Sequence, residues 1–123
     1  AVKISEEYLR QQAIERVGQK GTDLELIDKE LKDDKDVVLT AVRNNGLALQ
    51  FASETLKADK EVVLTAVMNY AIALEYASNA LKSDMEIAGT AVKDNGLALL
   101  HCSDTLKANI EIVTIAITTN GSA

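Results

Sequence analysis

The sequence predicts an all-α protein, an α-solenoid of short helical hairpins with a repeat of 25 residues. The first observation is the repeat itself, because three similar lines follow one another without insertion at 31–55, 56–80 and 81–105. Self-similarity at a fixed period is typical of stacked-repeat architectures. The second observation is that apolar residues in the first half of each line fall at i, i+1, i+4 and i+5, which places them on one helix face. The third is that the apolar pattern has no period of two and that Ala dominates the shared positions, which together disfavour strands.

The first half of each repeat predicts a helix with a capped start. An acid follows two positions after each capping residue, where the helix dipole favours it. The expected capping residues are Asp34, Asp59, Asp84 and Asn109. Pairs such as Asn45-Gly46 predict the end of the helix, because Gly accepts the left-handed conformation of a C-cap. Tyr70-Ala71 replaces this pair in the second full repeat, so we expect a different turn or a longer helix there.

The second half of each repeat predicts a second helix, which in the first full repeat runs from Leu47 to about Leu56. Apolar residues cover most of its circumference, so we expect it inside the stack. Recurrent Ala allows neighbouring helix axes to approach closely. A hairpin this short cannot bury its own apolar face, and stacked neighbours must cover it.

Residues 1–123 are expected to form a single helical-repeat domain. Residues 1–30 are the least regular part, and we interpret them as a degenerate N-terminal repeat or cap, since Val17 stands 25 positions before Val42. An unrelated leader helix is the alternative. Residues 106–123 are a partial repeat without its second half. Its isoleucines should face a missing hairpin, so we expect a piece of a longer protein that self-associates through its C-terminal end.

Composition excludes several kinds of partner. The net charge of −6 opposes binding to nucleic acid or to an anionic membrane surface. No apolar run approaches the roughly 18 residues of a membrane-spanning helix. One Cys cannot form an internal disulfide, so a reducing cytosol is compatible with the chain. We expect a soluble protein with no nucleic-acid or membrane partner.

His101 and Cys102 are adjacent, which raises the question of a catalytic pair. Neighbours on a helix point about 100° apart, so the thiol and the imidazole would not face each other. Cys102 also occupies the position of Ala52 and Ala77, which favours a packing substitution with a small buried thiol. A metal site needs more soft ligands than these two residues, so no cofactor or metal is expected.

Two polar rows recur at the repeat spacing. Ser53, Ser78 and Ser103 have no base at a fixed offset, so we expect each to bond back to a carbonyl one turn earlier rather than to act as a nucleophile. The second row could bind an anion, but we expect it to complement the C-terminal dipole of the second helix. This row consists of Lys32, Lys57, Lys82 and Lys107.

Exposed positions that vary between repeats are the candidates for partner binding. Leu64 and Met68 lie on the outward flank of the first helix, where they could anchor a partner. Packing of Leu39 and Leu64 between repeats is an equal alternative. The other candidates lie opposite the apolar face of the second helix: Gln50, Glu54, Glu75, Asn79, Leu100 and Asp104.

The shared line reads L-K-x-D-x-E-V-V-L-x-A-V-x-x-N-G-x-A-L-x-Y-A-S over roughly 15–123. It resembles the tandem repeat catalogued as domain of unknown function forty-one sixteen. The resemblance implies a helical-hairpin array that accompanies other domains in large proteins of protists and amoeba-associated bacteria, including secreted effectors of intracellular pathogens. The motif holds no catalytic residue to carry over. This chain departs from it at Ala71, at Gly89 and at His101-Cys102.

We therefore expect no enzymatic activity and a protein-interaction module of a larger protein, with a secreted bacterial effector as one setting. Host cytosol would be the compartment in that setting. The alternative is an architectural spacer that positions a neighbouring catalytic domain and binds nothing itself. The identity of the partner does not follow from the sequence.

Overall fold

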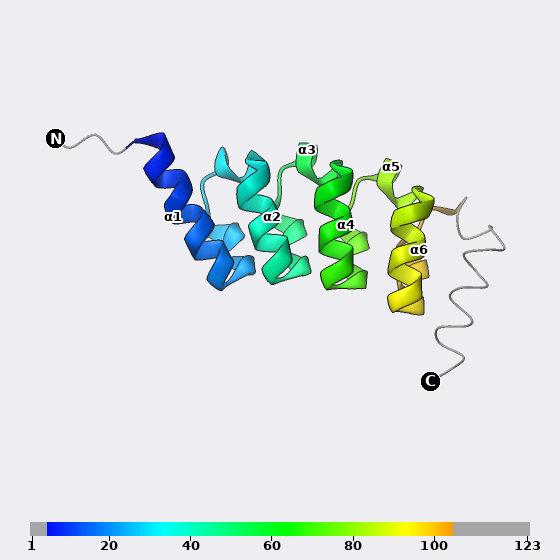
Figure 1. Cartoon of the computed structure of the whole chain (residues 1–123). Coiled ribbons are helices and arrows are strands. Elements are labelled where there is room, and N and C mark those ends of the chain that lie inside the picture. The colour runs from blue at the N-terminus through cyan, green and yellow to red at the C-terminus, as the bar shows by residue number, and fades with distance from the viewer. Residues whose placement is uncertain (1–4, 105–123) are drawn as a thin grey trace.

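The computed structural model describes residues 5–104 and shows a two-layered helical solenoid (Figure 1). Four α-helices stand side by side in chain order and form the first layer: α1 (Glu6–Gln19), α2 (Lys35–Asn44), α4 (Lys60–Asn69) and α6 (Met85–Asp94). A 3₁₀ helix follows each of them and packs beside the next one in the second layer: η1 (Gly21–Leu26), η3 (Gly46–Phe51), η4 (Ala71–Tyr76) and η5 (Gly96–His101). The prediction of an all-α solenoid is confirmed, and residues 5–104 contain no strand.

Short helical turns connect one unit to the next. They lie along one edge of the array, beside the N-terminal ends of the α-helices that they precede (Figure 1). These turns are η2 (Leu31–Asp33), α3 (Glu54–Lys57) and α5 (Asn79–Lys82).

The core lies between the two layers. Leu24, Leu49 and Leu74 enter it from successive 3₁₀ helices and are fully buried. Valine pairs such as Val37 and Val38 meet them from the α-helices. Side chains 25 positions apart therefore stack on one another, which explains why the apolar pattern repeats so strictly.

The prediction of one continuous second helix from Leu47 to Leu56 is wrong. The chain instead forms η3, becomes extended at Ala52 and Ser53, and starts again as α3. The break has a physical cause at Ser53, whose N–H donates to the Lys32 carbonyl of the preceding turn at 3.0 Å. The Ser53 hydroxyl oxygen accepts from the Leu56 N–H at 3.2 Å and so caps the new helix.

The expected left-handed glycine cap is also wrong, because no described residue has a positive φ. Asn45 ends α2 in an extended conformation with φ −152°. Gly46 is required by close approach instead, since a Cβ there would lie 2.4 Å from the Ala66 carbonyl oxygen of the neighbouring helix. Tyr70 has the same φ of −152°, so the different turn expected at Tyr70-Ala71 is absent.

The partial repeat at 106–123 and the self-association expected through it lie outside the described residues.

Candidate protein-interaction surface

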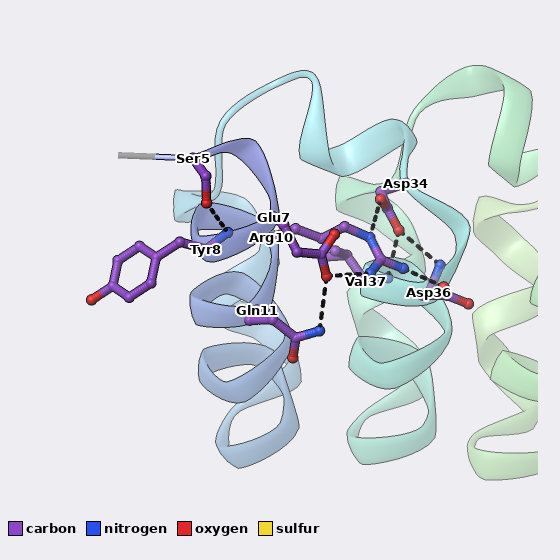
Figure 2. A network of polar contacts seen from close by, with 8 residues as sticks. All are labelled: Ser5, Glu7, Tyr8, Arg10, Gln11, Asp34, Asp36 and Val37. Atoms are coloured by element: carbon purple, nitrogen blue, oxygen red, sulfur yellow. Dashed lines mark hydrogen bonds and ion pairs between the residues drawn. The ribbon is translucent and has the colours of Figure 1, made fainter. Parts of the chain in front are cut away.

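A ladder of ion pairs joins each α-helix to the next along one edge of the array. Arg10 of α1 donates from Nε to Asp34 at 2.8 Å and from Nη2 to Asp36, both at the start of α2 (Figure 2). Lys35 of α2 contacts Asp59 and Glu61, each at 3.1 Å. The third step joins Lys60 of α4 to Asp84 at 3.2 Å and to Glu86 at 2.9 Å.

Each step of this ladder also caps a helix. Asp34 Oδ1 accepts from the N–H groups of Asp36 and Val37 at 3.0 and 3.2 Å (Figure 2). The expected roles of these acids were helix capping and a favourable interaction with the helix dipole, and their ion pairs with the preceding repeat were not predicted. A cation at positions 10, 35 and 60, each 24 residues before one acid and 26 before another, is the signal that could have shown them.

The capping aspartates share one electrostatic setting. Burial alone would raise the pKa of Asp34, but hydrogen bonds from Arg10 and from the backbone N–H of Val37 outweigh burial and lower it. The pKa of Asp59 is lowered in the same way, with Lys35 as the cation. Asp84 beside Lys60 has a lowered pKa as well. All three therefore hold their negative charge more firmly than a free aspartate.

An asparagine clamp joins the opposite ends of the first three α-helices. Asn44 Oδ1 accepts from the Gly21 N–H at 2.7 Å, while its Nδ2 donates to the Gly18 carbonyl at 3.1 Å. Asn69 repeats both bonds one unit later, with Gly46 and Arg43. Each clamp satisfies a first N–H of a 3₁₀ helix, which has no partner inside its own helix.

One row of the predicted partner-binding residues crosses the 3₁₀ layer. Gln50, Glu75 and Leu100 hold the same position on η3, η4 and η5, which pack side by side. Gln50 is half-buried and its Nε2 donates to the Leu47 carbonyl at 3.1 Å, so its amide nitrogen already has a hydrogen-bond partner. Glu75 is exposed, and Leu100 has 69% of its surface exposed.

A second row follows the capping serines. Glu54 and Asn79 are the first residues of α3 and α5, and Asp104 holds the same position in the next unit. All three are exposed. Glu54 contacts Lys57 at 3.4 Å across one turn of α3, an exposed pair of small energetic weight. We call the two rows together the variable face.

Leu64 and Met68 do not belong to the variable face, because they lie on α4 in the other layer. Leu64 packs against the core and Leu39 is only 6% exposed, so the packing alternative is correct for both. Met68 is 69% exposed. Tyr70, which was not among the predicted surface residues, is 42% exposed at the same end of α4. The eight predicted residues therefore do not form one site.

Cys102 and His101 differ in their burial. Cys102 is buried, as the packing interpretation predicts, and its Sγ donates to the Ala98 carbonyl at 3.7 Å. His101 ends η5 and is half-buried. No cluster of three or more potential metal ligands occurs among the residues that the structure describes.

Ser53 and Ser78 of the serine row act as helix caps. Ser78 repeats the arrangement of Ser53, with its hydroxyl accepting from the Leu81 N–H at 3.3 Å. The expected bond from serine to a carbonyl one turn earlier is therefore wrong at both positions. Lys57 and Lys82 stand in the last turns of α3 and α5, where the helix dipole favours a positive charge.

These units, each an α-helix followed by a 3₁₀ helix and joined to the next by polar ladders, define a helical-repeat solenoid. Four overlapping segments of the chain match the family described as Domain of unknown function (DUF4116), over residues 10–57, 34–82, 59–99 and 84–123. The chain belongs to this family. The searches of curated proteins and of solved structures give no match. None of the helices in the described part has the length and apolar character needed to cross a membrane.

Proposed function

We propose that this solenoid is a protein-interaction module of a larger protein and that it binds its partner along the variable face. One observation carries the proposal. The backbone of the second layer is the same in each unit, with Ala52, Ala77 and Cys102 each following a 3₁₀ helix in a buried position. The side chains that this frame presents outward differ from unit to unit.

The chemistry of the variable face suits recognition by both charge and apolar contact. The central row changes from an amide at Gln50 to a carboxylate at Glu75 and to an exposed apolar side chain at Leu100. Carboxylates at an interface set partner choice and association rate, whereas a buried apolar anchor supplies most of the affinity. A partner surface with a basic patch beside an apolar pocket would match this order.

An architectural spacer is the second candidate. The repeated ladders favour it, since Lys35 and Lys60 tie each unit to the next in the same way. A solenoid joined by such nearest-neighbour contacts can hold a fixed separation between flanking domains. In this reading the variable face binds nothing.

The larger protein in which we place the module is a secreted bacterial effector. This setting rests on the family resemblance alone, and with it the partner would be a host protein.

A capture experiment with matched charge variants separates binding from spacing. The module is immobilised and exposed to cell lysate, and bound proteins are identified by mass spectrometry. We expect Glu54→Lys with Glu75→Lys to abolish capture of a protein that the unaltered module retains. Glu15→Lys with Asp94→Lys changes the net charge equally at exposed positions outside the variable face and should retain it. Loss of capture in both variants, or no capture by the unaltered module, would favour the spacer.

A further inference from the structure

The end of the array beside α1 is hollowed. Two adjoining hollows of about 330 and 400 Å³ lie between α1 and residues 26–34 and share Leu9, Asp28 and Leu31 in their linings. We call them together the end groove. Its apolar lining is accessible, since 44% of Leu9 and 62% of Leu26 is exposed.

The polar lining of the end groove is acidic. Glu6, Asp28 and Glu30 line it, and none of them forms an ion pair within residues 5–104. The two cations of the groove are already engaged. Arg10 is held by the ladder at the start of α2, and Arg16 contacts Asp23 at 3.3 Å. Within residues 5–104, the end groove therefore combines an apolar lining with carboxylates that form no ion pair.

The side of α1 that faces the groove differs from the matching side of the other α-helices. Val37 and Ala41 of α2 are fully buried, because repeats stack on α2 from both sides. The matching positions of α1 are Gln12 and Arg16, and both are exposed. Another repeat of this kind would have to bury an amide and a guanidinium there, which is costly without hydrogen-bond partners.

The ladder of ion pairs gives a second, independent indication that the end groove does not suit another repeat of this kind. Asp34 and Asp36 accept the cation of the repeat before them. The residues 25 positions earlier are Leu9 and Gln11, which cannot accept a cation in this way. The α1 end of the array thus has polar side chains at the two positions that α2 fills with Val37 and Ala41, and it lacks the acid pair. We therefore expect an occupant with a different chemistry from a stacking repeat.

We propose that the end groove binds a basic amphipathic segment of a partner protein. Apolar side chains of this segment cover Leu9 and Leu26, and its Lys or Arg side chains reach the carboxylates of Asp28 and Glu30. Charge complementarity favours this partner, since Asp28 lines both hollows beside apolar side chains, and Glu6 and Glu30 line the second hollow. Helix-in-groove recognition uses the same combination of apolar anchors and charged rim. The proposal extends the interaction function to a surface separate from the variable face.

Titration with a labelled amphipathic peptide of Leu and Lys tests the proposal directly. In spectra of the isotope-labelled protein, we expect shifted amide signals to gather in α1 and in residues 26–34. By fluorescence anisotropy, Leu26→Ser should weaken binding about tenfold, as loss of an anchor side chain does. Leu100→Ser is the matched control, because Leu100 is similarly exposed but lies on the variable face, and it should leave binding unchanged.

A charge pair separates specific binding from attraction to an acidic protein. Glu30→Lys should weaken the peptide much more than Glu75→Lys, although both change the net charge equally. Equal weakening by the two variants, absence of binding, or equal binding of a Leu and Glu peptide would overturn the proposal. Shifted signals confined to η3, η4 and η5 would also overturn it while leaving the proposed function of the variable face intact.

Discussion

The contact between α2 and α4 and the contact between α4 and α6 share one apolar pattern but differ in polar detail. At the first contact, Asn69 accepts from the Gly46 N–H at 2.6 Å and donates to the Arg43 carbonyl at 3.0 Å. We call it the clamped contact. At the second, Ala71 and Asp94 replace the Gly and the Asn, and no hydrogen bond joins these two residues. We call it the unclamped contact.

The two contacts differ in the asparagine clamp alone among these polar interactions, because the ion pairs and the serine N–H bonds are the same at both. Lys35 serves the clamped contact and Lys60 the unclamped one, each with two carboxylates. The N–H groups of Ser78 and Ser103 donate to the turn of the preceding repeat at 2.9 and 3.1 Å. A carboxylate such as Asp94 cannot donate as the asparagine Nδ2 does. Stability along the array should therefore vary with the clamp.

The largest expected effect comes from overpacking the clamped contact. Ala66 and Ala91 are fully buried on α4 and α6 at matching positions. Ala66→Leu should cost about 3 kcal/mol, the upper end of overpacking costs, because the Ala66 carbonyl already lies against Gly46. Ala91→Leu should cost nearer 1 kcal/mol, since its contact lacks the glycine and the clamp. Urea denaturation of both variants measures the difference.

Glu61→Ala is the control for overpacking, because Glu61 is exposed on α4. Its effect should stay within about 0.5 kcal/mol. Equal denaturation midpoints for Ala66→Leu and Glu61→Ala would mean that Ala66 does not lie at a helix contact.

The next variant, Gly46→Ala, tests whether the close approach at the clamped contact requires glycine. Replacing Gly by Ala usually stabilises a protein by about 0.4–1 kcal/mol when the conformation allows it. Gly46→Ala should instead destabilise by about 2 kcal/mol, because its Cβ would press on the Ala66 carbonyl oxygen. Thermal unfolding of this variant shows whether the stability rises or falls. A raised melting temperature would show that the two helices can separate freely at this contact.

A third variant pair moves the clamp from one contact to the other. Asn69→Asp should cost about 1 kcal/mol, since the bond to the Arg43 carbonyl loses its donor. Ala71→Gly combined with Asp94→Asn should gain a similar amount by restoring both partners of the clamp. The gain should exceed the sum of the two single changes, which a double-mutant cycle measures. Strict additivity would contradict the clamp.

The solenoid and its core follow from the sequence because apolar spacing and the repeat period act locally and recur. Leu24, Leu49 and Leu74, for example, stand 25 positions apart and are all fully buried. The 3₁₀ geometry of the second layer was not predictable in this way. A 3₁₀ helix of six residues is uncommon, and here it depends on the bond from Ser53 to the preceding turn.

The surface was predicted less completely than the core. The variable positions from Gln50 to Leu100 lie where the period places them. For Leu64 the sequence left surface exposure and packing between repeats open, and packing is correct because a helix between two neighbours buries more than one face. No pattern in the sequence predicted the end groove. It depends on the path of residues 26–34, which pass beside α1 and include the short helix η2, and no sequence motif predicts this path.

The smallest expected effect is a pH dependence that should be the same at both contacts. The folded-state pKa of Asp59 is lowered, as is that of Asp84, so each carboxylate contributes stability above its unfolded pKa of about 3.9. This contribution is lost as the pH falls through the folded pKa. Asp59→Asn keeps a capping residue and removes the charge, so it should cost at most about 0.5 kcal/mol at pH 7 and nothing near pH 2. Asp84→Asn should follow the same curve in urea denaturation between these pH values. A larger loss for Asp59→Asn would show that the ion pair, and not the asparagine clamp alone, distinguishes the clamped contact from the unclamped one.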